Sequence, residues 1–261
     1  MKIALMDSGI GLLAAAAAVR RQRPDADLVL SSDPGGMPWG VHGPQGVIDR
    51  ALAVARAAAD HRPDALIVAC NTASVHALPA IRAALEPDIP VIGTVPAIKP
   101  AAADGGSVAI WATPATTGSD YQRALIRQFA GGADVTEVSC PGLADAVEHA
   151  DEAAIDEAVA AAAARTPSGV RAVVLGCTHY ELVGERIADA VRRHGSPAAE
   201  LYGSAGAVAA QALRRIGAGP AADGAAGARL TVLLGGHQGP LPTAALTYLE
   251  GRLLQAVSPA R

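Results

Sequence analysis

The chain has 261 residues, 51% of them hydrophobic, and a formal net charge of −4 at pH 7. This length can form one large domain or two small ones. The 21 lysines and arginines are scattered, which excludes a concentrated basic surface for nucleic acid or anionic lipid. No uncharged apolar run approaches the roughly 20 residues of a membrane helix, and the early acid Asp7 argues against a secretory signal. Three cysteines, an odd number, argue against a disulfide framework and favour a reducing, cytoplasmic compartment.

Short apolar runs alternate with helix-length patterns along most of the chain. The predicted strands are Ile3–Met6, Leu28–Ser31, Ala65–Ala69, Val91–Thr94, Ser107–Trp111, Asp134–Ser139, Arg171–Gly176 and Leu230–Leu234. The predicted helices are an alanine-rich segment around Ala14–Ala18, which suits close packing against a sheet, and Gly46–Asp60, Val75–Leu85, Gly118–Phe129, Asp151–Ala164, Glu181–Arg193 and Ala205–Ile216. This alternation predicts the α/β class, with parallel sheets covered by helices on both faces. The segment Gly217–Ala228, rich in Gly, Ala and Pro, is predicted to be a surface linker before a last strand and helix.

Two cysteines occupy matching positions, because Cys70 and Cys177 each end an apolar run and each precede a helical pattern. Ligands bind at the carboxyl ends of strands in such sheets, and the start of a helix favours a thiolate. A free cysteine is in general more often a buried small hydrophobe, and any two strand–helix units look alike. The matched settings nevertheless favour two thiols that remove a proton from one face of a carbon and return it to the other. The sequence therefore predicts a racemase without a cofactor.

Other familiar sites are not indicated. Cys140 is predicted to be structural, because Pro141 and Gly142 start a turn after it. The glycine-rich segment at residues 7–11 lacks the G-x-G-x-x-G pattern of a dinucleotide site. The histidines outside position 179 form no Cys/His cluster, which argues against a metal site.

Several polar residues fall beside the cysteines. Asp7 ends the first predicted strand and could cap the next helix, bind a substrate ammonium, or help a thiol exchange its proton. His179 could pass a proton beside Cys177, or cap and pack the helix start. Asn71, Thr72 and Thr178, and the loop Thr113–Gly118, could cradle a carboxylate at a helix start. Together these groups suit a small anion with an acidic C–H bond.

Seven segments in chain order resemble the glutamate racemases of the aspartate/glutamate racemase superfamily. The two cysteine segments are the most specific of them. The segments are Asp7–Gly11, Pro38–Gly40, Ala69–Ser74, Pro90–Gly93, Thr113–Tyr121, Cys140-Pro141 with Glu148, and Gly176–Tyr180.

The resemblance implies a cytoplasmic enzyme that interconverts L- and D-glutamate without pyridoxal phosphate or a metal, and that supplies D-glutamate for peptidoglycan of the cell wall. It also implies two similar parallel-sheet α/β domains with the active site in the cleft between them. The first domain would comprise residues 1–95 and 208–261, and the second residues 96–207. The partner is a small amino-acid substrate. The family is often dimeric, although no surface stripe in this sequence marks an interface.

Residue roles follow from the matching motifs. Cys70 would act on the D-enantiomer and Cys177 on the L-enantiomer, assisted by Asp7 and His179, with Glu148 in support. The residues expected to bind substrate are Ser8, Pro38, Trp39, Gly40, Asn71, Thr72, Thr113, Thr116, Thr117 and Thr178.

The chain departs from the family pattern at three places. Leu12 stands where a second glycine is usual, and Trp39 replaces a tyrosine in a loop near the side-chain carboxylate. Gly203-Ser204-Ala205 stands where the family has Asp-Ser-Ala. Two alternatives therefore stay open: a superfamily racemase for another acidic or specialised amino acid, and a non-catalytic binding protein on the same fold.

Overall fold

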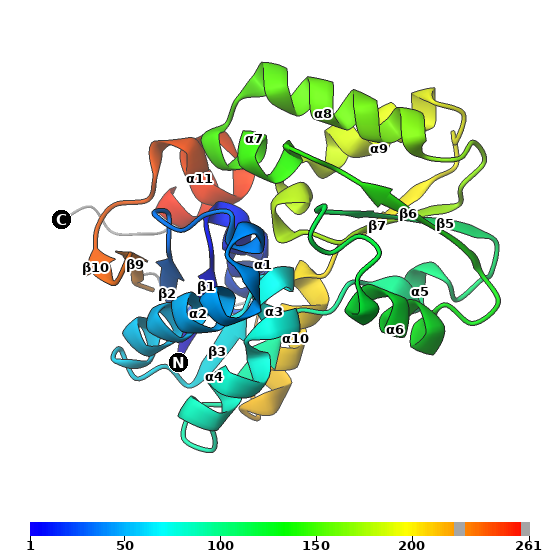
Figure 1. The fold of residues 1–261 in the computed structure, drawn as a ribbon. Coiled ribbons are helices and arrows are strands. Elements are labelled where there is room, and N and C mark those ends of the chain that lie inside the picture. Colours follow the sequence, from blue (N-terminus) through cyan, green and yellow to red (C-terminus); the bar gives the residue numbers. More distant parts are fainter. Residues whose placement is uncertain (222–227, 257–261) are drawn as a thin grey trace. The chain divides into compact units, whose positions relative to one another are not determined.

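The computed structural model describes residues 1–221 and 228–256. The chain forms two compact units, one of Met1–Val95 with Ala205–Arg261 and one of Pro96–Ser204. Each unit contains one sheet with helices packed on it, as Figure 1 shows. The predicted α/β class with two parallel-sheet regions is confirmed.

The sheet of the first unit has the strand order β10-β9-β2-β1-β3-β4. All pairings are parallel except that of β10 with β9, which is antiparallel. The strands are β1 (Lys2–Asp7), β2 (Asp27–Ser32), β3 (Ala65–Val68), β4 (Val91–Gly93), β9 (Leu230–Leu234) and β10 (His237–Gln238).

Helices cover both faces of this sheet. Ala4 and Met6 of β1 belong to the apolar cluster formed with α2, α3 and α4, whereas the alternate residues Ile3 and Leu5 point to the other face and are buried as well. The alanines of α1 are all buried, and the helix packs against α10 and α11, because small side chains allow close approach. The helices are α1 (Leu13–Gln22), α2 (Gly43–Ala59), α3 (Asn71–His76), α4 (Leu78–Leu85), α10 (Ala205–Arg215) and α11 (Leu249–Ala256).

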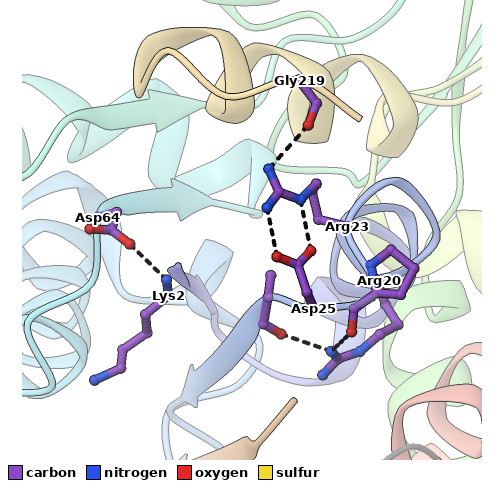
Figure 2. Close-up of polar contacts among 8 residues, drawn as sticks. Lys2, Arg20, Arg23, Asp25, Asp64 and Gly219 are labelled. Carbon is purple, nitrogen blue, oxygen red and sulfur yellow. Dashed lines mark hydrogen bonds and ion pairs between the residues drawn. The ribbon is translucent and has the colours of Figure 1, made fainter. Parts of the chain in front are cut away.

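Polar contacts hold the edge of the first unit where β1 begins (Figure 2). The Lys2 backbone N–H donates to Asp64 at 2.7 Å. Arg23 donates to both oxygens of Asp25, at 2.7 and 2.6 Å, and this contact lowers the pKa of Asp25 to about 2. The buried Arg20 donates to the Ala26 carbonyl at 2.7 Å. These contacts fix the amino-terminal edge of the sheet, opposite the edge that carries Cys70.

The second unit has a fully parallel sheet with the strand order β6-β5-β7-β8. Helices α5 and α6 pack on one face, against Val108, Ile110 and Val174. On β5, Trp111 alternates with Ile110, and its indole N–H donates to the Thr166 hydroxyl at 2.9 Å. The elements are β5 (Ser107–Ala112), β6 (Asp134–Ser139), β7 (Ala172–Leu175), β8 (Glu200–Tyr202), α5 (Ile98–Ala101), α6 (Asp120–Phe129), α7 (Leu143–His149), α8 (Glu152–Arg165) and α9 (Gly184–Arg193).

Two predicted helices differ from the structure, and two short strands were not predicted. The helix predicted at Val75–Leu85 is two helices, α3 and α4, and Pro79 lies in the first turn of α4, where its missing N–H is tolerated. The helix predicted at Glu181–Arg193 begins only at Gly184, after a 3₁₀ helix at Thr178–Val183. The strands β8 and β10 were not predicted, because three and two residues are too few to show alternation.

The predicted surface linker lies partly outside the described residues, since 222–227 belong to neither described range. Its flanks contact the first unit: the Ala221 N–H donates to the Gln22 carbonyl at 2.9 Å, and the Arg229 N–H donates to Asp27 at 2.7 Å. Among the helices of the described ranges, none combines the length and apolar character needed to cross a membrane.

Candidate active site

Cys70 lies at the carboxyl edge of the first sheet, between β3 and α3. Its backbone is extended, with φ −145° and ψ 121°, and its carbonyl accepts the Ser74 N–H at 2.9 Å as α3 begins. The side chain is 5% exposed and belongs to the same apolar cluster as Trp39 and Met6. The thiol is therefore held at the start of a helix, as the sequence predicts, with little contact with water.

Asp7 and Ser8 lie at the same edge of the sheet as Cys70. The register pairs Met6 with Val68, so the residues that follow, Asp7 and Ala69, emerge together. The Asp7 carboxylate is fully buried and accepts the Ser8 backbone N–H at 2.7 Å and the Ser8 hydroxyl at 3.4 Å. Donors of this kind offset the cost of burying a carboxylate.

Asn71, the first residue of α3, has a buried amide whose oxygen and nitrogen both lack a hydrogen-bond partner among the described residues. An unpaired buried amide costs about 1–3 kcal/mol, so such a group is suited to a polar ligand.

Trp39 is oriented by two residues that the sequence did not indicate, Asp33 and Arg50. The indole N–H donates to Asp33 Oδ2 at 3.0 Å, and Arg50 donates to the same oxygen at 2.9 Å. The ring is 1% exposed. Because the indole N–H is bonded to Asp33, a ligand at the segment Pro38–Gly40 would contact backbone groups rather than the indole N–H. No sequence pattern links Asp33 with Arg50, because 17 positions separate them.

Cys177 lies at the carboxyl edge of the second sheet, where the 3₁₀ helix Thr178–Val183 begins. Its backbone is again extended, with φ −139° and ψ 135°, and the side chain is 8% exposed. Gly176 precedes it, and a Cβ there would lie 2.8 Å from the Trp111 carbonyl oxygen. Glycine therefore allows the end of β7 to lie close to β5.

His179 connects Cys177 to Glu148. The Cys177 sulfur lies 3.9 Å from His179 Nδ1, and His179 Nε2 lies 2.9 Å from the Glu148 carboxylate on α7. A carboxylate only accepts hydrogen bonds, so Nε2 donates to Glu148, and in the neutral imidazole Nδ1 then faces the sulfur as an acceptor. The arrangement can take a proton from the Cys177 thiol and return it.

The loop Thr113–Gly118 differs from the predicted anion cradle. The backbone N–H groups of Thr116 and Thr117 donate to the Thr113 carbonyl at 3.0 and 2.9 Å. The Gly118 N–H donates to Glu137 at 3.0 Å. These three N–H groups are occupied within the protein, and the hydroxyls of Thr113 and Thr116 lie 3.2 Å apart, within hydrogen-bond distance of each other.

Cys140 directly follows β6 and is buried. Its thiol donates to the Val138 carbonyl at 3.5 Å, and burial raises its pKa to about 12. The Tyr180 hydroxyl donates to the Cys140 carbonyl at 3.2 Å. The turn predicted at Pro141-Gly142 is present, with Gly142 at φ +77°, and the helix α7 that follows it was not predicted.

The structure thus brings the predicted site residues together in two groups, one in each unit. Within the described parts of the chain, no three His, Cys, Asp or Glu side chains form a group that could hold a metal ion. The first unit groups Asp7, Ser8, Cys70, Asn71 and Thr72 with the segment Pro38–Gly40, and the second groups Glu148, Cys177, Thr178 and His179.

A sequence profile described as Asp/Glu/Hydantoin racemase matches residues 12–212 of this chain. The chain belongs to this racemase family.

Its relatives and structural neighbours include several glutamate racemases. The glutamate racemase of Roseiflexus sp. (strain RS-1) is 40% identical over 191 residues, which cover 69% of this chain and 68% of that protein. The glutamate racemase of Pseudomonas entomophila (strain L48) is 34% identical over 219 residues, which cover 82% and 80%. The crystal structure of Escherichia coli glutamate racemase in complex with L-glutamate and the activator UDP-MurNAc-Ala superimposes with a TM-score of 0.77 at 25% identity, covering 98% of this chain and 95% of that one.

Proposed function

We propose that this protein interconverts L- and D-glutamate by direct proton transfer at the α-carbon, without a cofactor, and so supplies D-glutamate for peptidoglycan. The observation that carries the proposal is the matched placement of Cys70 and Cys177. Each thiol follows a parallel strand, has an extended backbone, and begins a helix at the carboxyl edge of its sheet. The names of the relatives support glutamate as the substrate.

The reaction needs one base and one acid. In the L-to-D direction, the Cys177 thiolate takes the α-proton of L-glutamate and becomes a thiol, and the electron pair stays on the substrate carbon. The Cys70 thiol then gives its proton to the opposite face of that carbon and becomes a thiolate. D-glutamate results, and the reverse direction uses the same groups in opposite roles.

Each cysteine must afterwards regain its starting protonation state. On the Cys177 side, His179 Nδ1 accepts the thiol proton while Glu148 holds the imidazole in place. On the Cys70 side, the buried Asp7 carboxylate lies at the same strand edge and is the group suited to assist.

The carbanion must be stabilised by hydrogen bonds fixed in advance. The Asn71 amide, which has no partner among the described residues, can donate to the α-carboxylate together with the hydroxyls of Thr72 and Thr178. Ser8 is less suited, because its hydroxyl already donates to Asp7 at 3.4 Å. The hydroxyls of Thr113 and Thr116 lie 3.2 Å apart, so one donates to the other and the accepting one keeps its O–H as a further donor for a carboxylate. Thr117 is less suited, because its hydroxyl already donates to the Thr113 carbonyl at 3.0 Å.

A second candidate substrate follows from Trp39. Its indole N–H is bonded to Asp33, so the segment Pro38–Gly40 would bind the side-chain carboxylate through backbone groups. Tryptophan adds bulk where the family pattern has a tyrosine, and this departure favours a shorter acid such as aspartate as the alternative to glutamate.

We also propose that the two compact units are the two domains of the enzyme, that the protein acts in the cytoplasm, and that it forms a homodimer. The odd number of cysteines supports a reducing compartment. Sedimentation of the purified chain tests the dimer.

The proposed function is tested by incubating the purified protein with L- or D-glutamate, and in parallel with L-aspartate, in deuterated water without added cofactor. Chiral chromatography should show racemisation of glutamate, and mass spectrometry should show deuterium at the α-carbon of the product. Exchange with aspartate alone would favour the second candidate substrate. Binding of either acid without any α-exchange would contradict the proposal and support a binding protein.

A further inference from the structure

Glu181 makes to Ser204 the same two contacts that Asp7 makes to Ser8. Glu181 Oε1 accepts the Ser204 backbone N–H at 2.8 Å and the Ser204 hydroxyl at 2.7 Å. Asp7 Oδ1 accepts the Ser8 backbone N–H at 2.7 Å and the Ser8 hydroxyl at 3.4 Å. Both serines are buried just after a parallel strand. The two contacts therefore each fix the end of a strand, that of the interior strand β1 in the first sheet and that of the edge strand β8 in the second.

The topology of the second unit explains how Glu181 reaches Ser204. β7 and β8 are parallel neighbours, with Val174 opposite Tyr202. The segments that follow them emerge at one edge of the sheet. One is the 3₁₀ helix Thr178–Val183, which carries Glu181, and the other is Gly203-Ser204.

The glycine at position 203 is what leaves room for the Glu181 carboxylate. A Cβ at this position would lie 2.6 Å from Glu181 Oε2 and 2.9 Å from its carboxyl carbon. Gly203 has no carboxylate to offer the serine that follows it, whereas Asp7 stands directly before Ser8. Residue 181 supplies one from the neighbouring strand end instead.

We propose that Glu181 is a positioning residue, which ties the 3₁₀ helix that carries His179 to Ser204, the last residue of the second unit. A 3₁₀ helix has poorer hydrogen-bond geometry than an α-helix, and hydrogen bonds to a carboxylate are stronger than neutral ones. The Glu181 contact therefore stabilises the segment between Cys177 and α9. The catalytic part of this inference rests on the proposed function.

The test is an exchange of the carboxylate between positions 181 and 203. Glu181→Ala should lower kcat for glutamate racemisation about tenfold or more, with KM changed less than about threefold, because misplaced catalytic groups cost rate. Gly203→Asp should also lower kcat, because a second carboxylate would stand against Glu181. The double variant Glu181→Ala/Gly203→Asp should recover kcat to within about threefold of wild type, since the new carboxylate can bond Ser204 as Asp7 bonds Ser8.

Two further measurements separate positioning from general destabilisation. Hydrogen exchange of the Ser204 backbone amide should be slow in wild type, faster in Glu181→Ala and slow again in the double variant. The kinetic isotope effect with α-deuterated L-glutamate should rise in Glu181→Ala more than that with D-glutamate, because Cys177 acts on the L-enantiomer. Glu181→Gln keeps the side-chain shape and serves if Glu181→Ala fails to fold.

The matched control is Glu185→Ala, which removes the same charge from an exposed residue of α9. It should leave kcat and the Ser204 exchange unchanged. Two outcomes would overturn the inference. One is faster Ser204 exchange in Glu181→Ala without a change in kcat, and the other is a double variant whose kcat stays as low as that of Glu181→Ala. If wild type does not racemise glutamate, the proposed function fails, whereas the exchange of Ser204 still supports or overturns the Glu181 contact.

Discussion

The two cysteine turns share a backbone design and differ in the groups around the sulfur. Both residues are extended, follow a strand of a parallel sheet and start a helix. Cys177 has an imidazole 3.9 Å from its sulfur, and that imidazole is bonded to Glu148. At Cys70 the neighbouring groups are a carboxylate at the adjacent strand end and an amide without a partner among the described residues.

This difference indicates two ways of handling a proton. An imidazole has two ring nitrogens and can pass a proton to or from the sulfur beside it, whereas the Asp7 carboxylate offers only oxygens, one of which accepts from Ser8. The backbone fixes the position of each thiol, and the neighbouring side chains determine how readily the thiol regains its starting protonation state. Substitution of either cysteine should therefore be the least tolerated change in the site.

The largest expected effect comes from removing either sulfur. Cys70→Ala and Cys177→Ala should each lower racemisation by at least about 10³-fold, because one face of the carbon loses its acid or base. Chiral chromatography measures this loss. Substantial racemisation in either single variant would contradict the two-thiol mechanism.

A smaller effect should follow from breaking the His179–Glu148 contact. It should change proton transfer at Cys177 more than proton transfer at Cys70. Glu148→Gln leaves the imidazole without its charged partner, so kcat should fall about 10–100-fold. The isotope effect with α-deuterated L-glutamate should rise more than that with D-glutamate. Equal changes in both directions would show that His179 does not serve Cys177 in particular.

Loss of the hydrogen bond from Trp39 to Asp33 should lower the free energy of unfolding by about 1 kcal/mol. Trp39→Phe keeps an aromatic ring but removes the N–H that Asp33 accepts at 3.0 Å. Urea unfolding followed by circular dichroism measures the loss. Arg56→Ala, an exposed change in the same helix as Arg50, is the control and should leave the midpoint unchanged. A Trp39→Phe midpoint equal to wild type would show that this bond adds nothing.

The smallest effect is expected at the third cysteine. With a pKa raised to about 12 by burial, Cys140 stays a protonated thiol through neutral and mildly alkaline pH, and its thiolate forms only as the pH approaches that value. Iodoacetamide at pH 8 should therefore leave Cys140 unmodified in the folded protein, as peptide mass spectrometry can check. Cys140→Ala should keep most of the racemisation. Rapid labelling of Cys140, or loss of turnover in this variant, would contradict a structural role.

The sequence predicted the sheets well, because buried strands such as Ala65–Val68 and Ala172–Leu175 are apolar runs. It predicted the position of both cysteines at strand ends for the same reason. It did not predict the 3₁₀ helix after Cys177, since a helical pattern does not distinguish a 3₁₀ turn from the α-helix that follows it.

Contacts between residues far apart in the chain could not be found from the sequence. Asp33 bonds Arg50 across a loop and a helix, and Glu181 bonds Ser204 from the neighbouring strand end. Neither pair follows a helical or strand spacing. The glycine at 203 was visible as a departure from the family pattern, but its consequence for Glu181 required coordinates.

The chain contains two tryptophans, and each lies in the interior of a different unit with its indole N–H bonded to a side chain. They are two natural fluorophores, one for each sheet. Trp111→Phe leaves an emitter in the first unit alone, and its red shift on denaturation can be compared with that of a Trp39→Phe protein. Coincident emission curves would mean that both units melt cooperatively, and separate curves would resolve the order in which they melt.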